Sequence, residues 1–138
     1  MILVQVTYEL LDHELGQFQT QEAKGWHQLD GQIRLDFSDS PSVFISWVNE
    51  PLQHSIGFGP DSHFKPKALR NTMDMKNHPY WSNLVGGNLL ISFIEPHHQV
   101  VRVASDLAQV FLSSQYDDGM FQGDCVRVSP IQPSYVAV

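Results

Sequence analysis

Hydrophobic and polar residues alternate along much of the chain, and this pattern indicates short β-strands with one buried face. The first ten residues place two kinds of side chain on opposite sides of an extended segment, namely Ile2, Val4, Val6 and Tyr8 against Gln5, Thr7 and Glu9. A two-residue repeat is typical of a strand that packs on one side against a core. The sequence therefore predicts a first strand over residues 1–10.

The strongest alternation lies in residues 32–48 and predicts a β-hairpin. Its outgoing strand alternates Ile33, Leu35 and Phe37 with Gln32, Arg34 and Asp36, and its return strand repeats Val43, Ile45 and Trp47. Residues 38–41 have turn chemistry, and the Asp30-Gly31 pair before the hairpin favours another two-residue hairpin turn. We expect the outgoing strand to have one wet face that carries its three polar residues.

The rest of the chain predicts further strands and a helix. Strands are expected at 53–58, 89–94, 100–104, 108–113 and 124–129. A helix is expected within 72–87, with Asn77 as its N-cap, Pro79 in its first turn and Gly86-Gly87 after its end. In residues 10–25 the apolar positions fit either a short helix or an extended continuation of the first strand. The sequence thus predicts an α+β fold, mainly antiparallel β, in which a strongly bent sheet or small, partly open barrel of seven to eight strands packs with one or two short helices.

Length and composition point to one folded domain. The 138 residues suit a single hydrophobic core, so we expect one domain over 1–138. Apolar residues make up 42% of the chain and charged residues 17%, which excludes a disordered chain. Pro130 and Pro133 prevent regular strand pairing, and this allows the tail 130–138 to be mobile.

The net charge is acidic and lies in the first half of the chain. Residues 1–64 carry nine acidic and two basic residues, which accounts for the whole formal charge of −7, because six acids and six bases balance in the remainder. This charge repels nucleic acid and favours a basic protein partner. The candidate partner-binding residues are acids on or near the first hairpin: Asp36, Asp39, Glu50 and Asp61.

Cysteine content and hydropathy limit the compartment. Cys125 is the only cysteine, so an intrachain disulfide and a thiolate zinc site are both excluded. No apolar stretch approaches the roughly 18 residues needed to span a bilayer, and the first ten residues lack a basic leader region. We therefore expect a cytoplasmic protein without a membrane partner.

The search for catalytic and metal-binding motifs predicts neither an enzyme nor a cofactor. The seven histidines show no H-x-x-x-H or H-E-x-x-H spacing, and no G-x-S-x-G motif is present. Cys125 follows Asp124 within a predicted strand, where the carboxylate disfavours a reactive thiolate. We expect no catalytic residue, no bound metal and no cofactor.

Two other classes of function stay open at this stage. The first is a small enzyme or ligand-binding protein with a pocket in the bent sheet, where some of His54, His63, His78 and Cys125 converge. The second is a structural domain that forms a homodimer through an edge strand, with the long apolar first strand as the candidate edge.

Several short stretches, taken in their order between about residues 26 and 129, carry a resemblance to known proteins. They are Phe37, Val43 to Trp47, Pro79-Tyr80-Trp81, Leu84-Val85-Gly86, Val110 to Ser114 and Asp124 to Ser129. In these stretches the chain resembles a group of small bacterial proteins, some of which are similar to immunity proteins encoded beside secreted toxins. The resemblance implies an antitoxin-like protein that occludes a toxin by direct contact. Together with the acidic first half, it predicts a non-catalytic binding module that neutralises a basic toxin domain through an acidic surface.

Overall fold

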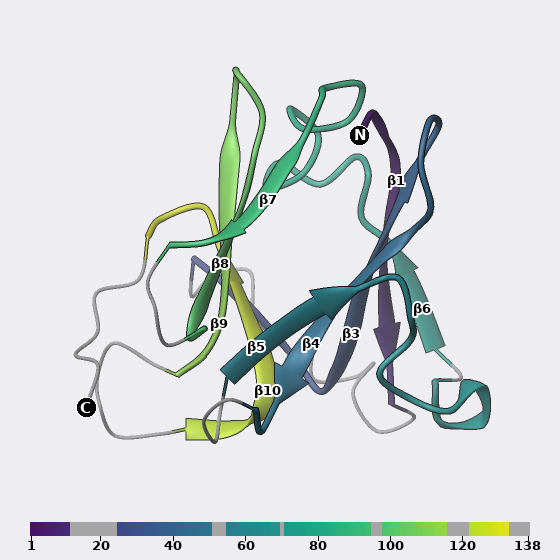
Figure 1. The fold of residues 1–138 in the computed structure, drawn as a ribbon, viewed down its shortest axis with the longest axis vertical. Coiled ribbons are helices and arrows are strands. Elements are labelled where there is room, and N and C mark those ends of the chain that lie inside the picture. Colours follow the sequence, from purple (N-terminus) through teal and green to yellow (C-terminus); the bar gives the residue numbers. More distant parts are fainter. Residues whose placement is uncertain (12–24, 51–54, 70, 95–97, 116–121, 133–138) are drawn as a thin grey trace.

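Two five-stranded antiparallel sheets make up the described part of the chain and cross one another at an angle, as Figure 1 shows. The computed structural model describes residues 1–11, 25–50, 55–69, 71–94, 98–115 and 122–132. In spatial order, the first sheet contains β5 (Ser55–Gly59), β4 (Val43–Val48), β3 (Gly31–Phe37), β1 (Leu3–Leu10) and β6 (Asn71–Asp74). The second sheet contains β2 (His27–Leu29), β10 (Gln122–Ser129), β9 (Gln109–Gln115), β8 (Val100–Ala104) and β7 (Leu90–Phe93).

The expectation of a mainly antiparallel β-fold is confirmed, but the number of strands and the barrel are not. The described residues form ten strands instead of seven to eight, and the two sheets do not close into a barrel. The strands that the sequence did not predict are β2 and β6, which have three and four residues. Segments this short hold too few residues for a periodic pattern, and each forms an edge by pairing with a longer strand.

The segment predicted as a helix forms β6 and then a run of turns, so the helical part of the α+β prediction is wrong. The backbone N–H of His78 donates to Met75, that of Trp81 to His78, and that of Leu84 to Trp81. Trp81 and Leu84 are fully buried, so apolar residues with helix-like spacing anchor successive turns in the core. The only helix in the described residues is the 3₁₀ helix Pro66–Ala68.

The hairpin predicted over 32–48 is confirmed as β3 and β4. Ile33 lies opposite Ile45, and Leu35 lies opposite Val43. Ile33, Leu35 and Ile45 have no exposed surface, as expected when apolar side chains fill one face of a pleated strand.

One residue of the expected wet face is buried. Gln32 has no exposed surface, and its amide nitrogen donates to Glu9 Oε1 and Ser62 Oγ, both at 2.8 Å. Its side-chain oxygen accepts a 2.8 Å bond from the backbone N–H of His63. The alternation placed Gln32 on the correct side of β3, but the loop after β5 covers that side.

β1 confirms the first predicted strand, with a different set of buried residues at its start. Its register against β3 shifts between Leu3 and Gln5. Because side chains alternate with a period of two, one extra residue reverses the two faces of the strand. Leu3 is therefore buried and Val4 is 45% exposed, whereas Val6 and Tyr8 are buried as predicted.

β1 is an interior strand, so its assignment as a candidate dimer edge is wrong. β3 pairs along one side of β1, and β6 pairs with its last four residues on the other side. The segment after β6 covers the rest of that side, because Met75 N–H donates to the Val6 carbonyl and Gly86 N–H to the Leu3 carbonyl. The pairing of β1 is thus completed within the chain.

The Asp30-Gly31 pair connects the two sheets, and the hairpin turn predicted there is wrong. β2 precedes the pair in the second sheet, and β3 follows it in the first. A Cβ on Gly31 would lie 2.1 Å from the backbone oxygen of Glu9, which leaves no room for a side chain. Close contact with β1, and not turn geometry, therefore requires the glycine.

The two sheets share a hydrophobic core and are joined beside the N-terminus. The core includes Leu35 and Leu112, which belong to the first and second sheets. At the junction the Leu3 N–H donates to the Gly87 carbonyl, and the Leu89 N–H donates to the Met1 carbonyl. After Leu89 the chain enters β7, so it passes there from the edge of the first sheet into the second (Figure 1).

The end of the chain after β10 is described only in part. Residues 130–132 are exposed, and the rest of the predicted tail, 133–138, lies outside the described residues. In the described ranges, no helix is long and apolar enough to cross a membrane.

Candidate functional site

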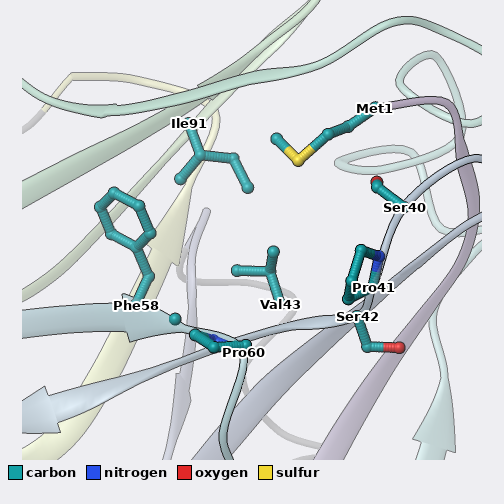
Figure 2. Close-up of a pocket in the computed structure, with 9 residues that line it drawn as sticks. Met1, Ser40, Pro41, Ser42, Val43, Phe58, Pro60 and Ile91 are labelled. Atoms are coloured by element: carbon teal, nitrogen blue, oxygen red, sulfur yellow. The ribbon is translucent and has the colours of Figure 1, made fainter.

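A cavity of about 320 Å³ opens between the two sheets beside the N-terminus (Figure 2). Its walls are almost entirely apolar, and the side chains of Met1, Val43, Phe58 and Ile91 point into the shared space. The lining is completed by Ser40, Pro41, Ser42, Gly59 and Pro60. The volume falls at the lower end of the roughly 300–1,000 Å³ that is usual for ligand pockets.

Turn residues at the ends of β4 and β5 leave this space open. Phe44 lies opposite Gly59 at the last pair of the two strands. Pro60 has no backbone N–H, so the ladder cannot continue, and Gly59 has no side chain to fill the space. Pro41 has a fixed φ angle and shapes the β3–β4 turn on the other side. The cavity is the gap between these two turns and β7.

Asp36, the first of the predicted acids, supports a wall of the cavity. Its carboxylate accepts a 2.9 Å hydrogen bond from Arg34 Nε and another from the hydroxyl of Ser42, which lines the cavity. The Arg34 guanidinium also lies 5.6 Å from the centre of the Phe44 ring. These contacts hold the β3–β4 turn against the outer face of the first sheet.

Asp39, the second acid, holds the N-terminus beside the cavity. It accepts a 2.7 Å bond from the Ile2 N–H, and its other oxygen lies 3.7 Å from the Met1 amine. The hydrogen bond from Ile2, with a further effect of the positive Met1 amine, lowers the pKa of Asp39. The same amine donates a 2.6 Å bond to Asn88 Oδ1. Met1 is therefore fixed as part of the cavity wall.

The other two predicted acids are both exposed, but only Asp61 is near the cavity. Asp61 directly follows Pro60, which lines the cavity, whereas Glu50 lies beyond the opposite end of β4. The six residues of β4 span about 20 Å at the usual rise of a strand. Asp39 and Asp61 thus adjoin residues that line the cavity, Asp36 contacts the lining residue Ser42 from the outer face of the first sheet, and Glu50 lies apart.

Sequence reasoning missed the cavity itself. Its lining residues come from the N-terminus, two turns and the adjoining ends of β4 and β5, and from β7, which are far apart along the chain. Each of these short segments resembles an ordinary turn or strand, and no spacing connects one with another. The only signal in the sequence was the group of acids next to two of the segments.

A second cluster, which we call the ring cluster, consists of Tyr8, His27, His78, Tyr80 and Trp81. Trp81 Nε1 donates a 2.8 Å hydrogen bond to the Tyr8 hydroxyl, which lies 2.9 Å from His27 Nδ1. Because an indole N–H can only donate, the Tyr8 oxygen accepts this bond and can donate its own proton to His27. The rings of His78 and Tyr80 pack on His27 with centroid distances of 4.5 Å.

The ring cluster connects three parts of the fold, and its hydrogen-bonded centre is buried. Tyr8 belongs to β1, His27 to β2 and Trp81 to the turns after β6, and none of the three has exposed surface. A buried polar chain of this kind stabilises the contact between the elements that supply it.

The residues proposed to converge in an enzyme pocket lie on separate elements. His54 is outside the described residues. His63 Nε2 lies 3.1 Å from the Phe44 carbonyl, His78 belongs to the ring cluster, and Cys125 is buried in β10. Within the described part of the chain, no group of three or more His, Cys, Asp or Glu side chains is arranged to hold a metal ion.

No protein-family model matches the chain, and no curated protein or solved structure matches it either. The candidate site is therefore defined by its geometry, an apolar cavity next to three acidic side chains.

Proposed function

We propose that the chain is a non-catalytic protein-binding module of the immunity type, which binds a basic toxin domain by taking one of its apolar side chains into the cavity. The observation that carries the proposal is the position of the cavity next to three of the four acidic residues predicted to bind a partner. Protein interfaces commonly combine an apolar anchor in a pocket with charges at the rim. A toxin held in this way is blocked by direct contact, without a chemical step.

The charges around the cavity favour a basic partner and differ in their availability. Asp36 is bonded to Arg34, and Asp39 lies beside the Met1 amine, so both negative charges are partly balanced within the chain. Asp61 is exposed and forms no ion pair among the described residues. Asp61 should therefore contribute most to the attraction of a positive partner, chiefly through the rate of association.

The apolar wall also fits a second candidate function, the binding of a small apolar molecule. Small-molecule sites usually add several convergent polar groups that fix the orientation of the ligand. In this cavity the hydroxyl of Ser42 donates to Asp36, and the hydroxyl of Ser40, which is buried without a partner, is a single group and not a convergent set. A protein side chain needs no such groups, because the surrounding interface orients it.

Binding is tested with two heptapeptides whose termini are blocked and whose central residue is leucine. The alternate positions carry lysine in one peptide and glutamate in the other. NMR titration should show saturable shifts at Met1, Val43, Phe58 and Ile91 with the lysine peptide and weaker shifts with the glutamate peptide. Higher salt should reduce the difference, because screening acts within about 8 Å at physiological ionic strength. The proposal is contradicted if neither peptide moves these resonances, or if a small apolar probe such as indole binds there and the peptides do not.

Two charge reversals provide a matched control for the position of the site. Asp61→Lys and Glu50→Lys change the net charge equally, and both residues are exposed. Asp61→Lys should slow association of the lysine peptide several-fold, whereas Glu50→Lys should have little effect because it lies at the far end of β4. Equal effects of the two variants would assign the acids to general solubility and remove the support for a basic partner.

The antitoxin role is tested in cells with the product of the neighbouring gene. If that product arrests growth, co-expression of the wild-type chain or of Glu50→Lys should restore growth, and Asp61→Lys should protect less well. Failure of the wild-type chain to protect would contradict this part of the proposal, even if the cavity binds peptides.

A further inference from the structure

β7 forms the edge of the second sheet next to the cavity, and the direction of its backbone groups can be derived from the register. The Ile94 N–H donates to the Val100 carbonyl at 3.2 Å, so this position faces β8. Hydrogen-bonded pairs recur every two residues in an antiparallel ladder. Ser92 opposite Arg102 and Leu90 opposite Ala104 are therefore the next bonded pairs along β7.

The backbone groups at the other positions of β7 point away from β8. The Leu89 N–H donates to the Met1 carbonyl at 2.8 Å, which shows that the odd positions face the N-terminus at this point. Ile91 and Phe93 continue the same side, and no described strand pairs with them there. The edge beside the cavity thus presents unused N–H and C=O groups at two successive odd positions.

The other edge near the cavity is occupied at one position. β5 is the edge strand of the first sheet, and the Ile56 N–H donates to the His98 carbonyl at 2.8 Å. This bond occupies the outward side of β5 with the segment that leads into β8. β7 is the edge with two successive positions, Ile91 and Phe93, that no described strand pairs with on their outer side, and we therefore consider it as the docking edge.

We propose, building on the proposed function, that the basic partner binds as an extended segment that adds to the free edge of β7 and inserts an apolar side chain into the cavity beside Ile91. Side chains alternate across a strand, so Ile91 faces the cavity while Leu90, which is 64% exposed, faces the opposite side. A residue paired with Ile91 points its side chain to the same face as Ile91. Strand addition provides affinity through the main chain, and the cavity provides selectivity.

The charge of the surrounding residues sets the chemistry of this segment. Asp36, Asp39 and Asp61 adjoin the wall opposite β7, so lysine or arginine should flank the apolar residue that enters the cavity. The short length of β7, four residues, limits the ladder to a few bonds. The segment therefore needs both the main-chain bonds and the buried side chain to bind well.

Amide hydrogen exchange of the whole chain tests the strand addition directly. Without peptide, the Ile91 and Phe93 amides should exchange faster than those of Ser92 and Ile94, which face β8. Saturation with the lysine heptapeptide should slow exchange at Ile91 and Phe93 by about tenfold or more and leave Ser92 and Ile94 nearly unchanged. Cavity shifts at Val43 without this protection would overturn the strand addition and leave the proposed function in place.

Backbone methylation of the probe supplies a matched control. Two versions of the lysine heptapeptide carry N-methyl groups on alternate residues, one on the odd positions and one on the even positions. A strand that pairs with β7 donates from one set only, so one version should bind about tenfold more weakly than the other. Equal affinities of the two methylated versions contradict strand addition. If the unmodified peptide does not bind at all, the proposed function is contradicted as well.

A second copy of the chain is the remaining occupant to be tested. If protection of Ile91 and Phe93 rises with protein concentration in the absence of peptide, the edge belongs to a homodimer and the proposal is overturned. Concentration-independent exchange, together with protection by the peptide, supports a foreign basic segment.

Discussion

The ring cluster and the cavity lie at the two edges of the second sheet, and they use polar groups in opposite ways. At β2 the Tyr8, His27 and Trp81 side chains form hydrogen bonds with one another and are fully buried. At the cavity beside β7, the carboxylates of Asp36 and Asp39 bond the opposite wall, formed by the β3–β4 turn and the N-terminus, and leave the interior apolar. Buried polar groups with fixed partners specify one arrangement, whereas an uncovered apolar wall can be covered by a partner. We therefore assign a role in stability to the ring cluster and a role in binding to the cavity.

Removal of the indole from the ring cluster should have the largest effect on stability. Trp81→Ala should lower the free energy of unfolding by about 3–5 kcal/mol, because it leaves a large cavity in the core. Trp26→Ala is the control, since Trp26 is half-buried and stacks on Arg127 at 4.0 Å; it should cost about 1 kcal/mol. Urea unfolding measures both values, and equal losses would show that the ring cluster has no special role.

Removal of a single hydroxyl from the ring cluster should have the next largest effect. Tyr8→Phe takes away the acceptor of Trp81 Nε1 and the hydroxyl beside His27, and it should cost about 1–3 kcal/mol because these groups stay buried. Thr7→Val, on the adjacent half-exposed position, should change stability by no more than about 0.5 kcal/mol. A Tyr8→Phe variant as stable as the wild type would mean that the hydrogen bonds are not important.

Addition of a methylene group separates the open region from the packed core. Val43→Leu extends a side chain into the cavity, so the free energy of unfolding should change by less than about 1 kcal/mol while affinity for the lysine peptide falls. Val103→Leu adds the same group to a fully buried position and should cost about 1–3 kcal/mol through overpacking. If Val43→Leu is the more destabilising of the two, the cavity is already filled and cannot be a binding site.

The smallest effect concerns acid pH. The pKa of Asp39 is lower in the folded chain than its ordinary value, chiefly through the hydrogen bond from Ile2. Its ionised form therefore stabilises the fold above pH 4, approximately, and this contribution is lost as the pH falls through the lowered pKa. Melting temperatures at pH 6 and pH 3 should differ less in Asp39→Asn than in the wild type.

Asp74 is the control for the pH measurement, because its pKa is also lowered, first by a hydrogen bond from the Gln5 side chain. Asp74→Asn should also reduce the loss of stability at acid pH, since the pKa of Asp74 is shifted in the same direction. Only Asp39→Asn should move the resonances of Met1 and Val43, because Asp39 holds the N-terminus at the cavity. Identical spectra for the two variants would show that Asp39 does not hold the N-terminus at the cavity wall.

The sequence predicted strands most successfully where one face packs on the core over several residues. The β3–β4 hairpin was predicted with its buried residues, because Ile33, Leu35 and Ile45 keep a clear two-residue period. The same reasoning was wrong for Val4, since a register shift in β1 changes which side faces the core. It also predicted a helix at Trp81 and Leu84, because an apolar spacing alone does not distinguish a helix from anchored turns.

The sequence by itself determined the antiparallel strands, the acidic first half and the absence of recognised catalytic motifs. These properties depend on neighbouring residues, whose side chains alternate in or out of the core and whose charges simply add. Only the tertiary structure placed Asp61 beside the cavity and Glu50 far from it, exposed the edge of β7 and joined Tyr8 with His27 and Trp81. Those arrangements depend on how two sheets meet at Met1 and Leu89, and contacts between distant segments leave no periodic signal in a single sequence.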